Sequence, residues 1–406
     1  MKWWESATFY EIYLRSFADG NGDGVGDLIG LRSRLEYLKW LGVSALWITP
    51  FYPSPMADHG YDVSDYRSVD PLFGSIEDID GVIEDAHRIN MRVIVDFVPN
   101  HTSDRHPWFQ NAVSDPRHPD RDKYIFRDPA PDGGPPNNWV SVFGGPAWSL
   151  DERSGQYYLH LFAPEQPDLN WRNPEVHEYF DETLKFWLDR GIDGFRIDVA
   201  HGLFKDEQLR DQPNTETPIR AIDQLYAFDQ PEVHDVYRRW RRIVDSYPGD
   251  RVLVGEVFIR DPKRVASYVR SDELHLAFNF FLLGQPWDSR QMRPAIEMSM
   301  AELGEVGARV TWVLSNHDLT RHPTRYGGGE TGLRRARAAV PFLLALPGAV
   351  FLYQGEELGL EEALVPDHLR ADPIFLRTSG QMAGRDGCRI PIPWEEQSPG
   401  YGFSSA

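Results

Sequence analysis

Apolar and polar positions along the chain follow two alternating patterns. Eight short runs are rich in β-branched and aromatic residues, as strands are, and amphipathic segments lie between most of them. These runs cover residues 9–15, 43–49, 91–98, 194–199, 251–258, 274–280, 309–316 and 349–355. Strands that alternate with helices pair in parallel, so the pattern predicts an α/β protein built as a (β/α)₈ TIM barrel. A doubly wound open sheet has the same local pattern and is the alternative fold.

The segments between the runs have the spacing of amphipathic helices. In residues 28–42, "LIGLRSRLEYLKWLG", one apolar stripe is formed by Leu31, Leu35, Leu38 and Leu41. Similar stripes predict helices over residues 175–191 and 332–348.

The interval 101–173 interrupts this alternation. It is rich in Pro, Asp, Asn and Trp, as in "DPAPDGGPPNNW", and it has little helical periodicity. We therefore expect a subdomain that is inserted after the third strand and lines the active site. The catalytic barrel would then comprise residues 1–100 and 174–406.

Composition narrows the classes of partner. Lys and Arg number 42 and Asp and Glu number 62, which gives a formal net charge of −20. A surface of this sign repels nucleic acid and anionic membranes, so neither is expected as a partner. The one cysteine, Cys388, excludes an intrachain disulfide. No signal sequence or membrane span is recognised, and a cytoplasmic protein is expected.

Acidic and basic side chains gather where the predicted strands end. They are Asp96 and His101 in "DFVPNH", Arg196 and Asp198 in "GFRIDVAHG", Glu256 in "VLVGEVF", and His317 and Asp318 in "SNHD". Barrel enzymes carry their chemistry at the carboxyl ends of the strands, so these groups are expected to meet around one mouth. Any one of them could be a helix cap or a structural carboxylate. Four such motifs together favour a catalytic site.

These motifs also carry a family resemblance. In this order, "DFVPNHTS", "GFRIDVAHG", "GEVF" and "SNHD" resemble the four signature regions of the α-amylase superfamily of glycoside hydrolases. The segments "ADHGYDVSDY", "GPAW" and "GRDGCRIPIPW" resemble its α-glucosidase and oligo-1,6-glucosidase branch. The resemblance covers essentially the whole chain. It implies a (β/α)₈ barrel with a subdomain after the third strand, in agreement with the pattern.

The resemblance assigns catalytic roles to three carboxyl groups. Asp198 aligns with the nucleophile of a retaining glycosidase and Glu256 with its acid/base, two groups that such enzymes hold about 5–5.5 Å apart. Asp318 aligns with the third carboxylate, which binds sugar hydroxyls. Arg196 projects to the same side of its strand as Asp198 and is expected to keep it ionised.

Other matching positions form the expected substrate pocket. Asp96, His101 and His317 are expected to bind the glucosyl unit. Asp58 and Tyr61 in "DHGY" would hold its far end, with Arg385 paired to Asp58, and would make the enzyme exo-acting. His59 replaces the more familiar asparagine of this motif. Phe143 and Gln166, from the inserted subdomain, either line the pocket or only pack.

The stretch "DGNGDGVGD" alternates acidic or amide side chains with glycines, as loops that bind a hard cation do. It begins like an EF-hand, but Gly30 stands where the bidentate glutamate of an EF-hand is needed. A solvated turn is the alternative. The resemblance implies structural Ca²⁺ held by Asp19, Asn21, Asp23, the Val25 carbonyl and Asp27, and no organic cofactor.

The expected function is a retaining exo-acting α-glucosidase that hydrolyses terminal α-glucosyl residues of short oligosaccharides through a covalent glucosyl-enzyme. Alternatives within the superfamily are an oligo-1,6-glucosidase, a trehalose synthase and a transglucosidase. Val199 resembles α-1,6-preferring members, whereas "DVAHGLFKD" as a whole resembles α-glucosidases of broader preference, so the linkage stays open. A non-catalytic homologue is the distant alternative, since all three carboxyl groups are kept.

The end of the chain carries one more expectation. In the resembling family, a final barrel helix and a C-terminal β-domain follow the eighth strand. No helical stripe of normal length occurs after residue 360, and a proline interrupts "EEALVPDHL". We therefore expect both elements to be missing, and apolar surface near the first and eighth strands to be exposed.

Overall fold

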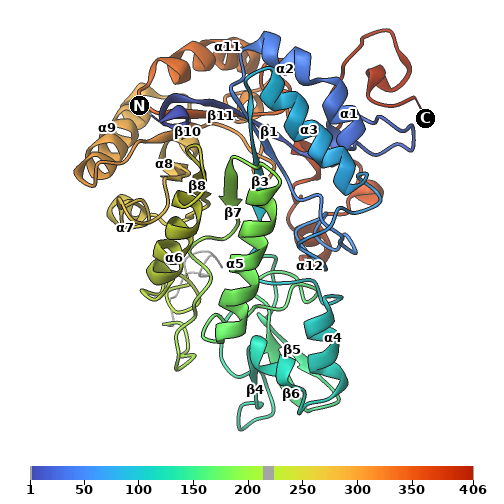
Figure 1. Cartoon of the computed structure of the whole chain (residues 1–406), viewed down its shortest axis with the longest axis vertical. Coiled ribbons are helices and arrows are strands. Elements are labelled where there is room, and N and C mark those ends of the chain that lie inside the picture. Colours follow the sequence, from blue (N-terminus) through green and yellow to red (C-terminus); the bar gives the residue numbers. More distant parts are fainter. Residues whose placement is uncertain (1, 214–223, 406) are drawn as a thin grey trace.

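The computed structural model describes residues 2–213 and 224–405. Eight parallel strands form one sheet, in the order β10-β11-β1-β2-β3-β7-β8-β9 (Figure 1). Their bounds are β1 Thr8–Ile12, β2 Ala45–Ile48, β3 Arg92–Phe97, β7 Gly194–Ile197, β8 Val252–Gly255, β9 Leu276–Ala277, β10 Thr311–Val313 and β11 Ala349–Tyr353. The last strand pairs with the first, as a barrel requires and an open doubly wound sheet does not. The predicted barrel is confirmed.

The ring of strands has one weak seam. β9 and β10 stand at the two ends of the strand order and share no ladder of backbone hydrogen bonds. A side chain bridges them instead, because the Thr311 hydroxyl donates to the Ala277 carbonyl at 2.5 Å. The barrel is therefore closed by a side chain at this seam.

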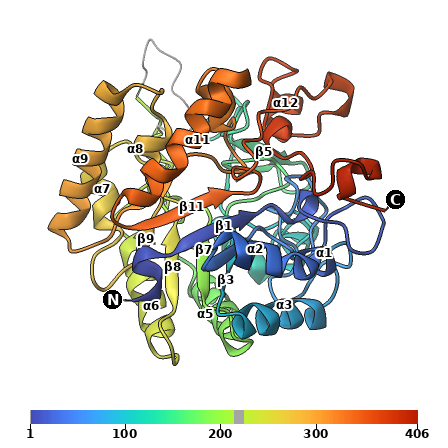
Figure 2. The ribbon, with the colours of Figure 1, turned by 90° about the horizontal axis from the view of Figure 1, so that it is seen from above.

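Helices surround the strands on the outside (Figure 2). Their bounds are α1 Leu28–Ser33, α2 Leu35–Leu41, α3 Ile76–Arg88, α4 Pro107–Ser114, α5 Pro174–Asp189, α6 Val233–Asp245, α7 Pro262–Ser267, α8 Phe280–Leu283, α9 Ser289–Glu305, α10 His322–Arg325, α11 Gly329–Ala345 and α12 Pro373–Arg377. Local sequence explains where the long helices α3 and α5 begin. Ser75 and Asp78 form a capping box for α3, and Asn173 caps α5 with a proline in the next position.

The predicted helix over residues 28–42 is two helices. The backbone leaves helical geometry at Arg34, with φ −105° and ψ 4°. One residue earlier, the Ser33 hydroxyl donates to the Gly30 carbonyl at 2.7 Å. Such local bonds from serine to the backbone compete with the helical pattern. Gly42 then ends α2 in the left-handed conformation, with φ 92°.

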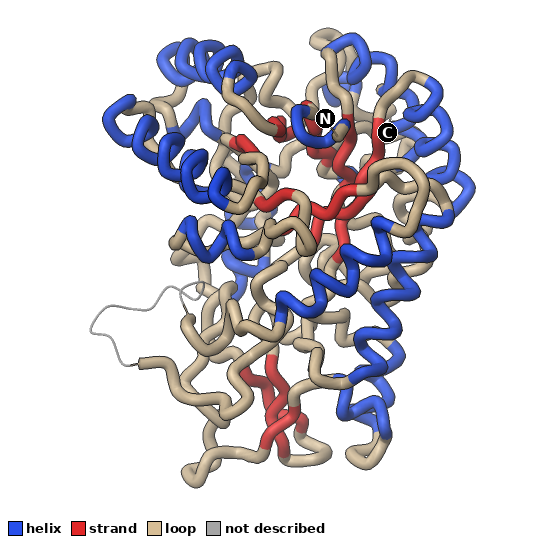
Figure 3. The backbone as a smooth tube through the Cα atoms, turned by 60° about the vertical axis from the view of Figure 1, so that its left-hand side comes forward, coloured by secondary structure: helices blue, strands red, loops and turns tan. Residues whose placement is uncertain are grey.

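The segment between β3 and α5 stands apart from the barrel. It contains α4 and a small antiparallel sheet, in the order β4-β6-β5, seen below the barrel in Figure 3. The strands are β4 Phe126–Arg127, β5 Trp148–Asp151 and β6 Gln156–Leu159. A buried ion pair fastens it to the barrel: the Lys205 ammonium lies 2.6 Å from the Asp168 carboxylate. The ammonium also donates to Asn100, next to His101, at 2.8 Å.

Two apolar layers stabilise the barrel. Inside the ring of strands, Phe9 stacks on Phe351 with ring centroids 4.3 Å apart, and Trp47 packs beside them. Between strands and helices, a larger layer includes Trp187 and Trp240. Complete burial of these aromatic side chains supplies much of the hydrophobic stabilisation.

After β11 the described residues form loops and short helices, of which α12 has five residues. The final barrel helix and the β-domain, both expected to be missing, are not found among residues 354–405. Exposed apolar side chains occur nearby: Trp40 on α2 is 79% exposed and Leu344 on α11 is 50% exposed. Within residues 2–213 and 224–405, no helix combines the length and the apolar character needed to span a bilayer.

Gly194 offers a test of how closely β7 and β8 approach. A Cβ at this position would lie 2.1 Å from the Val252 carbonyl oxygen. Gly194→Ala should therefore lower the free energy of unfolding by about 1–3 kcal/mol or more, measured by denaturant titration. Gly304→Ala is the control, since nothing lies within 4 Å of its added Cβ in α9. It should raise the free energy by up to about 1 kcal/mol. Equal changes in the free energy of unfolding for the two variants would contradict the close approach of β7 and β8 at Gly194.

Candidate active site

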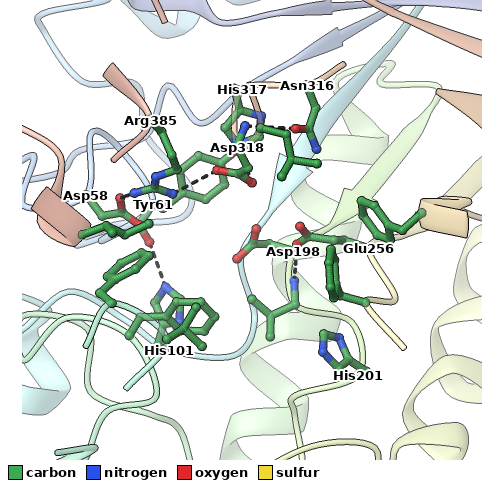
Figure 4. A pocket seen from close by; sticks show the side chains of 18 of the residues that line it. Asp58, Tyr61, His101, Asp198, His201, Glu256, Asn316, His317, Asp318 and Arg385 are labelled. Atoms are coloured by element: carbon green, nitrogen blue, oxygen red, sulfur yellow. Dashed lines mark hydrogen bonds and ion pairs between the residues drawn. The ribbon is translucent and has the colours of Figure 1, made fainter. Parts of the chain in front are cut away.

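A cleft of about 260 Å³ opens at the carboxyl ends of the barrel strands (Figure 4). This volume lies slightly below the range of about 300–1,000 Å³ typical of small-molecule sites. Its polar lining residues are Asp58, Tyr61, His101, Asp198, His201, Glu256, Asn316, His317, Asp318 and Arg385. The structure thus brings the predicted strand-end motifs into one site.

Arg196 lies at the base of the cleft and joins three carboxyl groups. Its guanidinium contacts Asp96 at 2.7 Å, Asp198 at 2.6 Å and Glu256 at 3.0 Å. Arg196 comes from β7, and alternation along the strand points it to the same side as Asp198. One buried cation therefore sets the positions of groups from three strands.

The turn after β7 adds a second link to Glu256. Val199 has φ 44°, a left-handed conformation that is unusual for a β-branched residue. In this conformation its backbone N–H donates to the Glu256 carboxylate at 3.0 Å. The strained turn directly after Asp198 thus orients the neighbouring carboxyl group.

Burial changes the electrostatics of this cluster. It raises the pKa of Asp198 well above its usual value, and Arg196 opposes this effect without cancelling it. Burial likewise raises the pKa of Asp96 to about 6 against the pull of Arg196. The predicted ion pair between Arg196 and Asp198 is present, and within it the guanidinium favours the ionised carboxylate while burial opposes ionisation. Because three carboxyl groups surround one guanidinium, the cluster as a whole favours retention of a proton on one of them.

Arg385 organises the end of the cleft farthest from Glu256. It contacts Asp58 at 2.6 Å, Asp318 at 2.9 Å and Asp372 at 2.5 Å. Arg389 adds a contact to Asp318 at 3.0 Å. Burial raises the pKa of Asp318, but the guanidinium groups of Arg385 and Arg389 hold it well below its usual range. Asp318 is therefore an ionised acceptor for hydrogen bonds.

Three histidines face the cleft, and burial leaves two of them, His101 and His317, neutral. Burial lowers the pKa of His101 to about 4 and that of His317 well below its usual value. His317 stacks on Tyr61 with ring centroids 5.2 Å apart. Its Nδ1 lies 2.5 Å from the carboxyl group of Glu11, which is buried in β1. Both imidazoles are thus held in fixed orientations.

The two residues expected from the inserted subdomain have different positions. Phe143 lines the cleft and lies under the Arg385 guanidinium, 4.8 Å from the ring centroid. Gln166 lies behind the lining. Its amide nitrogen is 3.2 Å from Asp58 and 3.1 Å from the His101 ring. Asp96 and Arg196 also lie beneath the lining rather than in it.

Several residues of the site are not singled out by the sequence motifs. Glu11 and Arg389 orient His317 and Asp318, and Asn316 accepts from the Asp318 N–H at 3.0 Å. Further apolar lining comes from Val142, Phe162, Phe228, Phe258, Phe280, Leu319 and Ile374. Glu11 had a signal, since it is a charged residue inside the apolar run 9–15.

The Asp19–Asp27 loop lies outside this cleft. The Asp19 carboxylate accepts from the N–H groups of Gly22 at 2.7 Å and Gly24 at 2.8 Å. Asp27 caps α1 through the Gly30 N–H at 2.6 Å. Across the described chain, no group of three or more His, Cys, Asp or Glu side chains is arranged to hold a metal. The side chains and the Val25 carbonyl that are expected to hold Ca²⁺ in this loop offer only oxygen atoms, which hard cations prefer as ligands.

Comparison with known proteins agrees with this geometry. The sequence pattern of the family described as "Alpha amylase, catalytic domain" matches residues 11–406. The chain belongs to the α-amylase family. A probable alpha-glucosidase of Rhizobium meliloti (strain 1021) is 42% identical over 100% of this chain and 76% of the relative. An oligo-1,6-glucosidase of Heyndrickxia coagulans is 36% identical over 97% of this chain and 77% of the relative.

A solved structure extends the likeness to the whole fold. The α-glucosyl transfer enzyme XgtA superposes with a TM-score of 0.95 at 44% identity, covering 100% of this chain and 77% of that one. The α-amylase family barrel thus has relatives described as hydrolases and a relative described as a transfer enzyme.

Arg385 offers a test of the ion-pair network in this family member. Arg385→Ala leaves the buried carboxylates of Asp58 and Asp372 without their cation. It should lower the free energy of unfolding by about 3–5 kcal/mol, measured by denaturant titration. Arg290→Ala removes an arginine that also pairs with an aspartate but is 87% exposed, and it should cause no measurable change. A loss no larger for Arg385→Ala than for Arg290→Ala would show that the network adds nothing to stability.

Proposed function

We propose that the protein is a retaining exo-acting α-glucosidase that acts on short oligosaccharides. One observation carries the proposal: Asp198 and Glu256 contact the same Arg196 guanidinium at the mouth of an α-amylase family barrel. A retaining glycosidase needs one ionised carboxylate and one protonated carboxylic acid beside the scissile bond. A cluster with three carboxyl groups and one cation favours that mixed state.

The reaction would proceed in two steps. The Asp198 carboxylate attacks C1 of the glucosyl unit while the Glu256 carboxylic acid protonates the leaving oxygen. The bond between C1 and that oxygen breaks, and a glucosyl ester with Asp198 forms. Glu256, now a carboxylate, then takes a proton from the incoming water or alcohol, which attacks C1 and releases Asp198. Release of the α-anomer of glucose, followed by NMR, is the direct test of retention.

The far end of the cleft supports exo action. Arg385 bridges Asp58 and Asp318, and Phe143 packs against its guanidinium, so this end is occupied by protein. Asp58, Asp318, His101 and His317 supply hydrogen-bond partners for the hydroxyls of one glucosyl unit. The relatives include an oligo-1,6-glucosidase and a transfer enzyme, so the α-1,6 linkage and glucosyl transfer are the alternative activities of the same site.

We also propose that the Asp19–Asp27 loop binds Ca²⁺ as a structural ion. Asp19, Asn21, Asp23, Asp27 and the Val25 carbonyl carry the oxygens that would hold it. Positive φ values at Gly22 and Gly24, 82° and 92°, give the loop the tight path that such sites use. The ion would stabilise the first loop at the catalytic face without contacting substrate.

Asp198→Asn tests the nucleophile. The amide cannot form the glycosyl ester, so turnover should be abolished while the melting temperature stays near that of the wild type. Initial rates on maltose and isomaltose and a thermal scan are the measurements. Activity within about tenfold of the wild type would exclude Asp198 as the nucleophile.

Glu256→Gln tests the acid. Loss of the proton donor should slow cleavage of oligosaccharides far more than cleavage of a glucosyl donor with a very good leaving group, which needs no protonation. The ratio of kcat/KM for maltose and for α-glucosyl fluoride is the measurement. Equal losses on both substrates would assign the acid to another residue.

Removal of Ca²⁺ tests the loop. Depletion with a chelator should lower the melting temperature, and added Ca²⁺ should restore it, because an ion that binds only the folded state stabilises it. The Asp23→Asn variant should show a smaller shift. An unchanged melting temperature after verified depletion would identify the loop as a polar turn.

A further inference from the structure

His317 lies between two carboxyl groups. Its Nδ1 is 2.5 Å from a carboxyl oxygen of Glu11 in β1, and its Nε2 is 3.4 Å from a carboxyl oxygen of Asp318. The side chains of Glu11 and His317 are each 1% exposed, and His317 and Asp318 line the cleft. Figure 4 shows Asp318 beside His317 and in contact with Arg385. The imidazole thus connects a carboxyl group beneath the lining of the cleft with one that belongs to the lining.

The environment of Asp318 indicates which ring nitrogen of His317 carries hydrogen. Arg385 and Arg389 contact one oxygen of the Asp318 carboxylate, at 2.9 Å and 3.0 Å, and hold the pKa of this group well below its usual range. The other oxygen faces Nε2 of His317. A bare lone pair on Nε2 would be repelled by this anionic oxygen, whereas an N–H is attracted to it. The hydrogen of the imidazole therefore belongs on Nε2.

This assignment determines the role of Glu11. Burial lowers the pKa of His317 well below its usual value, so the ring is neutral and carries one hydrogen. With that hydrogen on Nε2, Nδ1 has a lone pair, and the hydrogen in the 2.5 Å contact comes from the carboxyl group of Glu11. Burial raises the pKa of Glu11 well above its usual value against the opposing effect of Arg196, as a carboxylic acid requires. The backbone N–H of His317 reaches the same oxygen at the longer distance of 3.3 Å.

His101 has a comparable partner of different chemistry. The amide nitrogen of Asn100 lies 3.1 Å from Nδ1 of His101, and the Asn100 oxygen accepts from the Lys205 ammonium at 2.8 Å. An amide nitrogen can only donate. The partner at Nδ1 is thus an amide for His101 and a carboxylic acid for His317. An amide in place of Glu11 would supply the same hydrogen, which makes Glu11→Gln an informative substitution.

We propose that Glu11 is a positioning residue that donates a hydrogen to Nδ1 of His317 and thereby presents Nε2–H to a hydroxyl of the glucosyl unit. The proposal rests on the proposed function, since it needs a bound glucosyl unit. A hydroxyl between His317 and Asp318 can accept from Nε2–H and donate to the carboxylate at the same time. Without the hydrogen from Glu11, the imidazole is free to take the other tautomer, whose Nε2 lone pair cannot donate to the hydroxyl.

Sugar donors that lack one hydroxyl test this role. α-Glucosyl fluoride is compared with each of its monodeoxy analogues, and kcat/KM is taken from fluoride release. For the hydroxyl that His317 binds, the ratio of kcat/KM for the parent to that for the deoxy donor measures the contact. This ratio does not depend on the amount of folded enzyme. Glu11→Met removes the hydrogen donor at similar length and should lower the ratio about three- to thirtyfold, the range expected for one hydrogen bond.

Two further variants separate donation from packing. Glu11→Gln restores an N–H at Nδ1 and should recover most of the ratio that Glu11→Met loses. Glu357→Met is the matched control, because Glu357 is a half-buried glutamate outside the cleft that accepts from Tyr10 at 2.8 Å and from Tyr37 at 3.1 Å. It should leave every ratio unchanged. Unchanged ratios in Glu11→Met, or an equal loss in Glu11→Gln, would overturn the proposal.

The position of the hydrogen is measured on the wild type. ¹⁵N NMR of protein labelled at histidine should show His317 with hydrogen on Nε2 and a lone pair on Nδ1, and the signals that are missing from His317→Asn identify it. Hydrogen on Nδ1, with or without hydrogen on Nε2, would overturn the proposal whatever the activity. Absence of fluoride release by the wild type would instead overturn the proposed function, while the NMR spectrum would still decide the position of the hydrogen.

Discussion

The site depends on one guanidinium buried where water cannot reach it. Arg196 contacts Asp96, Asp198 and Glu256, which come from three neighbouring strands. An arginine keeps its charge even when fully buried, so it can hold carboxyl groups together that would otherwise repel one another. Desolvation makes this cluster costly, and the packed barrel around it compensates for the cost. The contacts of Arg196 therefore determine both the positions of the carboxyl groups and the stability of the centre of the barrel.

A second network fixes the other end of the cleft, and the inserted subdomain joins it. Arg385 holds carboxylates from the loop after β2, the loop after β10 and the segment after β11. Gln166 reaches both Asp58 and His101 from the subdomain. The subdomain therefore contributes to the cleft through Gln166 behind the lining, as well as through Phe143 in it.

Local pattern was sufficient for much of this architecture. The strands, the insertion, and the gathering of Asp198, Glu256 and Asp318 follow from period and position at strand ends. Contacts between distant residues do not show in such patterns. Glu11 and His317, 306 positions apart, meet only because β1 and the loop after β10 are neighbours near the closure of the barrel. The net effect of burial on Asp198 likewise depends on how many carboxyl groups share Arg196, which a motif does not state.

The side-chain bridge between Thr311 and Ala277 has a consequence for how the geometry of the cleft is lost on heating. A barrel opens first where the fewest backbone bonds must break, and hydrogen exchange should begin at this seam. Asp318 follows β10 on one side of it, whereas Asp198 and Glu256 follow strands on the other. Local opening between β9 and β10 would move the Asp318 carboxylate away from Asp198 and Glu256 while most of the core stays packed. Gentle warming would therefore separate these carboxyl groups before the barrel as a whole melts.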